Sequence, residues 1–137
     1  MSAARNRNHV REFYRAMNQR SNGAEVDLGQ FFTENVSWQL PRSSPLRGCL
    51  EGRAAVVELF NGPVDDYYKP GSSAFDHHHQ IADADFVVMQ FTMSAITVNG
   101  HDYENDYCML FRLEGGLIAE VREFFDTAHL FSMINPD

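Results

Sequence analysis

An alternation of apolar and polar side chains runs through the second half of the chain and constrains its fold more than any other feature. From Phe86 to Val98 most odd-numbered positions are apolar, and the pattern returns after Asn99-Gly100 and again after Gly115-Gly116. Successive side chains of a β-strand point to opposite faces, and Asn-Gly and Gly-Gly pairs favour hairpin turns. The pattern therefore predicts three long antiparallel strands whose odd-numbered residues face the interior, with Glu123 as the one carboxylate on that side.

A fourth strand is predicted before these three, over residues 72–81. Phe75, His77, His79 and Ile81 would share the inner face of this strand, and His78 would point outward. Two histidines on one inward face make it more probable that at least one of them lines a site, although a core or edge histidine is the usual alternative for either one.

The first half of the chain has helical spacing instead. Val10, Phe13, Tyr14 and Met17 follow the i, i+3, i+4, i+7 pattern of a helix face, which predicts a helix from an Asn8 cap to about Ser21. Further segments are predicted as a short helix after Asp27, a strand over 35–40, and a third helix from Arg53 that the Gly-Pro pair at 62–63 breaks or kinks.

Helices followed by a meander of strands predict one α+β domain over residues 1–137, with three helices packed on the concave face of a strongly bent antiparallel sheet. Such a sheet leaves room for a pocket between its concave face and the helices. The net charge of -8 and the pI near 5.1 argue against nucleic acid or an anionic membrane as a partner. With no apolar run long enough to span a bilayer, a cytoplasmic protein is expected.

Glu123 is the first candidate for chemistry because burial among apolar side chains raises the pKa of a carboxyl group towards neutrality. The alternatives are that the end of the strand twists Glu123 to solvent or that an arginine pairs with it. Asn105 on the inner strand and the phenol of Tyr14 on the first helix are candidate hydrogen-bond donors to a carbonyl oxygen or an oxyanion, although backbone contacts or core packing would also account for them. A two-histidine, one-carboxylate metal site formed by His77, His79 and Glu123 is a lesser alternative.

Several segments together resemble the nuclear transport factor 2-like superfamily, in its SnoaL-like, ketosteroid-isomerase-related branch. They are VREFYRAM at 10–17, FFTENVSWQLP at 31–41, the GxxxGR run at 48–53, YENDY at 103–107 and FRLEGGLIAEVREFFDT at 111–127. The resemblance implies a conical α+β barrel with a deep pocket, a homodimer, a small-molecule ligand and no cofactor. Members of this superfamily include isomerases, cyclases, dehydratases, epoxide hydrolases and non-catalytic proteins.

Residue by residue, the resemblance assigns Tyr14 to the oxyanion-donor position of the steroid isomerases, while their two catalytic carboxylates fall near Leu40 and Met109. The Arg and Asp of limonene epoxide hydrolases fall at Phe91 and Met93, and their last carboxylate falls at Glu123. The polar contact of the first strand falls near Gln39, whereas strand parity favours Trp38, so the facing of that strand stays open. The side chains expected to line the pocket are Trp38, Gln39, Phe60, Phe91, Met93, Asn105, Tyr107 and Met109.

The sequence thus favours a cofactor-independent acid–base enzyme, an isomerase, cyclase or dehydratase, acting on a small apolar or polycyclic metabolite. Glu123 would move the proton, His79 or His77 would assist it, and Tyr14 would polarise a carbonyl group. A non-catalytic binding or accessory protein is the main alternative, because both established catalytic patterns of the superfamily are incomplete here.

Overall fold

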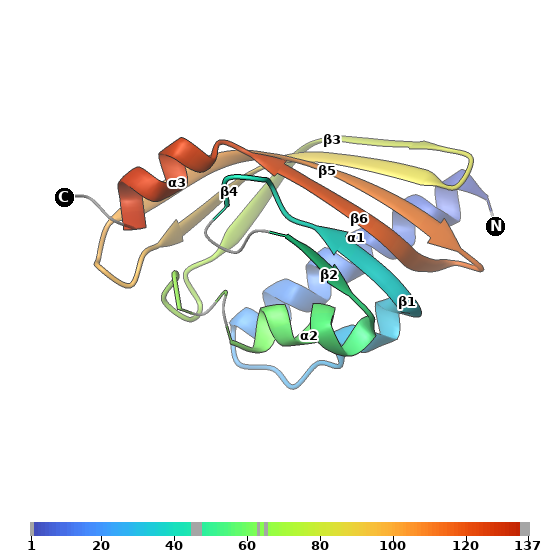
Figure 1. Cartoon of the computed structure of the whole chain (residues 1–137), viewed down its shortest axis with the longest axis horizontal. Helices are drawn as coiled ribbons and strands as arrows, with labels where there is room; N and C mark the ends of the chain where they lie inside the picture. Colours follow the sequence, from blue (N-terminus) through green and yellow to red (C-terminus); the bar gives the residue numbers. More distant parts are fainter. Residues whose placement is uncertain (1, 45–47, 63, 65, 135–137) are drawn as a thin grey trace.

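The computed structural model describes residues 2–44, 48–62, 64 and 66–134 as a layer of helices against one curled sheet (Figure 1). The elements in chain order are α1 (Ala3–Ser21), the 3₁₀ helix η1 (Leu28–Phe31), β1 (Phe32–Gln39), β2 (Cys49–Glu51), α2 (Arg53–Asn61), β3 (Ala74–Asp83), β4 (Phe86–Ile96), β5 (Asp102–Glu114), β6 (Leu117–Phe125) and α3 (Thr127–Ile134). The predicted α+β class is confirmed.

The six strands form one sheet in the order β2-β1-β6-β5-β4-β3. All neighbouring pairs are antiparallel except β1 and β6, which are parallel. The prediction of an antiparallel sheet was therefore wrong at this pair, and the curled sheet is not closed into a barrel. Alternation shows which face a strand buries, but it carries no information on the direction of the neighbouring strand. In Figure 1 the sheet arches over α1 and α2, while α3 lies at one end beside the C-terminus.

The alternation predicted for β4 and β5 is present. Met89 pairs with Met109 and Phe91 with Tyr107, and all four are buried. In β6 a register shift opposite Arg112 and Leu113 turns Ile118 inward as well, after which Val121, Glu123 and Phe125 follow the predicted face. The inner face of the sheet is therefore built largely as the sequence indicates.

Strand β3 departs from the prediction because a bulge interrupts its pairing with β4. His77 lies opposite Phe91, but His79 lies opposite Gln90, so one extra residue is accommodated at His78. A one-residue shift reverses every following side chain. His79 is consequently exposed on the outer face, and Ile81 is 61% exposed, which corrects the prediction that both face the interior.

The ends of the helices differ from those that the sequence predicts. Helix α1 starts earlier than predicted because the Ser2 hydroxyl accepts a hydrogen bond from the Arg5 amide at 3.1 Å, so Asn8 is an interior residue and not the cap. Helix α2 ends at Asn61, before the predicted break. Helix α3 was not predicted, although the Asp126 carboxylate caps it by accepting from the His129 amide at 3.1 Å.

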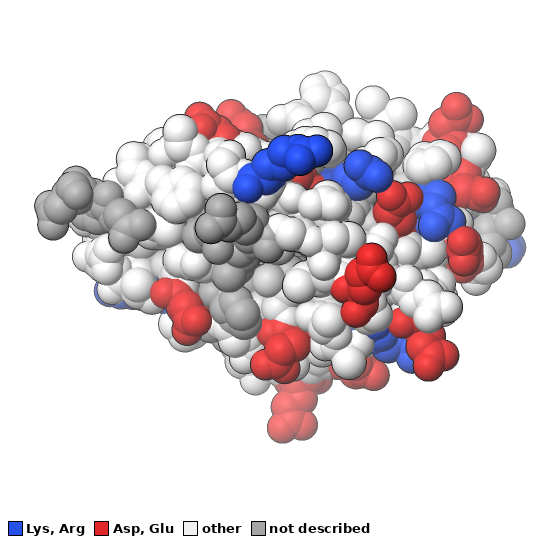
Figure 2. Space-filling model, in the orientation of Figure 1, with Lys and Arg blue, Asp and Glu red and all other residues white. Residues whose placement is uncertain are grey.

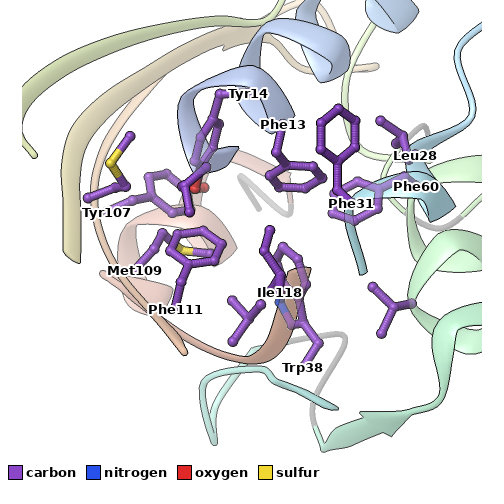
Figure 3. Close-up of a cluster of buried hydrophobic side chains, with 14 of the residues drawn as sticks. Phe13, Tyr14, Leu28, Phe31, Trp38, Phe60, Tyr107, Met109, Phe111 and Ile118 are labelled. Atoms are coloured by element: carbon purple, nitrogen blue, oxygen red, sulfur yellow. The ribbon is translucent and has the colours of Figure 1, made fainter. Parts of the chain in front are cut away.

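Phe13 is the centre of the aromatic core that joins the helices to the sheet (Figure 3). It is fully buried. Its ring contacts those of six aromatic residues, namely Tyr14, Phe31, Phe32, Trp38, Phe60 and Phe111. Because these residues come from α1, η1, β1, α2 and β5, the cluster fixes α1 across the sheet and thereby places Tyr14 at the edge of a pocket.

Candidate functional site

A pocket of about 340 Å³ lies between the concave face of the sheet and the helices. Its wall is mostly apolar and aromatic, with side chains from both layers. The predicted lining residues Trp38, Phe60, Phe91, Met93, Tyr107 and Met109 all contribute. The sheet and the helices do not enclose the pocket, which opens to solvent, and exposed residues of the loops after α1 and α2, including Gly23 and Pro70, lie at its mouth.

Glu123 is the single carboxylate among the described residues that line this pocket. It lies on the inner face of β6 opposite Met109. The Trp38 indole Nε1 donates a hydrogen bond to Glu123 Oε1 at 2.8 Å. Burial raises the pKa of the Glu123 carboxyl to about 7, although the Trp38 hydrogen bond lowers it in part. A group with that pKa can both give and take a proton near neutral pH.

Strand β1 places Trp38 beside the Glu123 carboxylate. Trp38 lies opposite Val121 in the parallel pair of β1 and β6, and it is buried. The Gln39 amide instead donates to the Leu40 and Gly48 carbonyl oxygens at 3.1 and 3.2 Å. The sequence left open whether Trp38 or Gln39 faces the interior. In the structure Trp38 does, and Gln39 is not among the residues that line the pocket.

Tyr14 supplies a second polar group. Its hydroxyl is buried and has no hydrogen-bond partner among the described residues. Burial raises the pKa of the Tyr14 phenol well above its usual value, and the nearby charge of Glu123 raises it further. The rings of Phe75 and Phe91 hold the Tyr14 ring at centroid distances of 5.4 and 5.2 Å. A protonated, unpaired phenol in an apolar pocket is suited to donate to a ligand oxygen.

Asn105 does not line the pocket but supports its wall through hydrogen bonds. Its side-chain amide donates to the Tyr103 hydroxyl at 2.7 Å and to the Asp126 carbonyl oxygen at 2.9 Å. The Tyr103 hydroxyl is in turn 2.8 Å from that of Tyr107, which does line the pocket. The Tyr107 ring stacks on Phe91 with centroids 5.4 Å apart. Asn105 therefore positions one wall of the pocket through Tyr103 and is not itself among the residues that line it.

Neither histidine joins Glu123. His77 faces inward, but its ring lies on the other side of Tyr14, at a centroid distance of 4.8 Å, in a separate surface hollow beside Arg11 and Arg15. Burial lowers the pKa of His77. Because His79 points outward after the bulge, the three proposed metal ligands do not converge, and no group of three potential ligands occurs in the part of the chain that the structure describes.

The sequence did not assign a function to the segment between α2 and β3, which contributes Tyr67, Tyr68, Lys69 and Pro70 to the pocket wall. The helix predicted from Arg53 concealed this, because a helix that only kinks at residues 62–63 would continue into this segment. One signal was present nonetheless, since Lys69 is the only lysine in the chain. Leu130 of the unpredicted helix α3 also lines the pocket.

Replacing Trp38 with phenylalanine should raise the pKa of Glu123 above its value of about 7. The indole N–H hydrogen-bonds the carboxylate and so favours the ionised form, and phenylalanine removes that donor while keeping an aromatic ring. Carbon-13 NMR of the labelled Glu side-chain carboxyl groups over a pH series would measure both values. An unchanged or lower pKa in the folded variant would show that the hydrogen bond does not control this group.

A family model for the SnoaL-like domain matches residues 10–121 of the chain. Among solved structures, an NTF2-like protein of unknown function from Burkholderia pseudomallei K96243 has a TM-score of 0.82 at 24% identity, over 98% of this chain and 99% of the other. TerC, co-crystallised with polyporic acid, has a TM-score of 0.79 at 19% identity, over 95% and 98% of the two chains. A protein from Jannaschia sp. CCS1 described as a SnoaL-like polyketide cyclase has a TM-score of 0.72 at 16% identity, over 95% and 94%.

No curated protein matched the sequence. At these identities the structural similarities establish the fold alone. None of the helices that the structure describes is long and apolar enough to cross a bilayer.

Proposed function

The chain belongs to the SnoaL-like domain family, and from this premise we propose that it is a cofactor-independent enzyme that moves a proton on a small apolar or polycyclic molecule. The observation that carries the proposal is Glu123, a carboxylate with a pKa of about 7 in a pocket of mostly apolar lining. Catalytic acids and bases work best when their pKa lies near the operating pH, and burial is the usual means of raising a carboxyl group to that value.

The arrangement suits proton abstraction next to a carbonyl group. Glu123 would take the proton from the carbon, and the electron pair left behind would move to the carbonyl oxygen. The Tyr14 hydroxyl, which has no partner in the described protein, would donate to the resulting enolate oxygen. The Trp38 N–H would hold the Glu123 carboxylate in place during the transfer. Where the enolate is conjugated with a carbon–carbon double bond, return of the proton from Glu123 to the far carbon gives an isomer. Where the enolate attacks a second carbonyl carbon, a ring closes and the new alkoxide takes the proton back from Glu123.

The shape and chemistry of the pocket support an apolar ring system as the body of the substrate. The stacked pair Phe91 and Tyr107 offers flat surfaces, and Met93 and Met109 can adapt to an irregular outline. A volume of about 340 Å³ is within the range of small-molecule sites. Structural neighbours point in the same direction, since one is described as a polyketide cyclase and another was crystallised with polyporic acid.

Proton exchange in D₂O tests this function without knowledge of the natural substrate. We expect the protein to accelerate the loss of α-proton NMR signals from at least one member of a panel of tetralones and steroid ketones. Exchange should be faster at pH 8 than at pH 6, because the base must be ionised to accept a proton. Ketones that bind, as seen by a change in the emission of Trp38, but exchange no faster than in buffer would contradict the proposal.

A second candidate function is that of a binding or accessory protein. It is favoured by Leu40 and Met109, apolar residues of the pocket wall that leave Glu123 as the single carboxylate among the described lining residues. In this case the protein would bind ligands tightly and convert none of them. The exchange experiment separates the two functions, because it measures binding and proton transfer on the same ketones.

A further inference from the structure

The only lysine in the chain lines the candidate site. Lys69 belongs to the loop between α2 and β3, and this exposed residue is one of those that line the pocket that contains Glu123. Lys69 is exposed, whereas Glu123 is deep enough for burial to raise its pKa. The pocket therefore has a basic group, Lys69, at its outer part and an acidic group, Glu123, at its inner part.

The backbone holds Lys69 firmly at this position. Its amide donates to the Ile96 carbonyl oxygen at 2.8 Å, next to a bridge that pairs Tyr68 with Thr97. Its carbonyl oxygen accepts from the Ser72 hydroxyl at 2.7 Å and from the Ser72 amide at 3.2 Å. These bonds tie the loop to the end of β4 and fix the position of the Lys69 backbone beside the pocket.

The Lys69 ammonium group makes no ion pair with any residue that the structure describes. Acidic side chains outnumber basic ones in this chain, whose net charge is -8. On the face shown in Figure 2, acidic side chains are spread over the surface and the basic ones lie in a few small groups. An unpaired cation at the edge of an apolar pocket can interact strongly with an anionic ligand group, because the pocket wall excludes water from one side.

We propose that the ligand is an amphiphilic organic anion, an aromatic or polycyclic acid whose ring body fills the pocket while its acidic group meets Lys69 at the mouth. The inference rests on the proposed function and narrows its substrate class. The apolar wall is suited to bind the ring body, and Lys69 is suited to pair with the acidic group. Arg20 also lines this pocket, where its guanidinium donates to the Asn61 side-chain oxygen at 2.9 Å, so Lys69 and Arg20 both offset the negative charge of the protein for such a ligand.

Two dyes that differ in a single charged group test the assignment. They are 8-anilinonaphthalene-1-sulfonate, whose sulfonate stands for the acidic group, and the neutral N-phenyl-1-naphthylamine, which has the same ring body. Trp38 is the only tryptophan, so energy transfer from Trp38 to the dye reports how much dye is bound, and the effect of the Lys69 variant on it tests whether the dye is bound at the pocket. We expect Lys69→Gln to weaken binding of the sulfonate about three- to tenfold, as the loss of a partly desolvated ion pair predicts, and to change binding of the neutral dye less than about twofold.

Arg5→Gln is the matched control. It removes one positive charge from an exposed residue in the first turn of α1 and changes the net charge equally. It should leave the affinity for both dyes unchanged, and thermal unfolding would confirm that each variant is folded. Equal weakening of both dyes by Lys69→Gln, no weakening of either, or failure of both dyes to bind the wild-type pocket would overturn the proposal. The dye measurements need no turnover, so they remain informative if the enzymatic function proposed above fails its own test.

Discussion

Replacing Glu123 with glutamine is expected to lower kcat about 100- to 10,000-fold, the range that a positioned acid or base contributes. Glutamine keeps the shape of the side chain and can still accept the hydrogen bond from Trp38, but it cannot take up or release the proton. Ligand affinity should change far less than kcat, since the pocket wall is unaltered. The comparison requires kcat and KM for a compound that passes the exchange experiment, together with the affinity of a non-reacting ligand.

Glu120→Gln is the matched control for this variant. Glu120 lies on the same strand and pairs with Arg112 and Arg122 at 3.2 and 3.1 Å, outside the pocket. It has the same side chain, and its replacement by glutamine should leave kcat within about twofold. In the wild type, kcat should rise with pH through about 7 if Glu123 acts as the base, because the ionised form is the active one. A folded Glu123→Gln variant with turnover close to the wild-type value would remove Glu123 from the mechanism.

The largest effect on stability is expected at Phe13. Phe13→Ala should lower the free energy of unfolding by about 3–5 kcal/mol, the usual cost of deleting a fully buried aromatic ring. The ring contacts residues from five elements, so neighbouring side chains cannot close the cavity without moving α1 away from the sheet. Urea unfolding followed by circular dichroism would measure the loss. Because Tyr14 follows Phe13 on α1, ligand binding should weaken as well.

Phe124→Ala serves as the comparison for this variant. Phe124 is 55% exposed on β6, and its truncation should cost less than about 1 kcal/mol. If Phe13→Ala does not fold, Phe13→Leu should show a smaller loss of the same sign, because leucine leaves less empty volume. A loss below about 1 kcal/mol at Phe13 would mean that the aromatic cluster does not determine the position of α1.

The sequence predicted the parts of the fold that depend on local periodicity. In β4 and β5 the alternation is regular, and every inward residue that it identified from Met89 to Phe111 is buried. The prediction failed where one residue interrupts the period. A single bulged position at His78 placed His79 and Ile81 on the outer face, and three consecutive histidines gave no signal of which one would be accommodated in the bulge.

In the candidate site, too, the sequence identified only residues that stand out within a local pattern. Glu123 was found because it breaks an apolar pattern within its own strand, and Tyr14 because it follows helical spacing. The partner of Glu123 could not be found in this way, because the Trp38 hydrogen bond depends on how β1 pairs with β6. The contribution of Lys69 depends likewise on a loop whose position is set by hydrogen bonds to β4.

The parallel pairing of β1 with β6 also bears on the order in which the protein folds. The β4–β5 hairpin joins residues close in sequence and can form early, whereas the Trp38–Glu123 contact closes a separation of 85 residues. Contacts between distant residues are slow to form, because the entropy of the intervening chain must be lost first. We therefore expect the Trp38–Glu123 pair to assemble in a late folding step, and during translation only after β6 has left the ribosome.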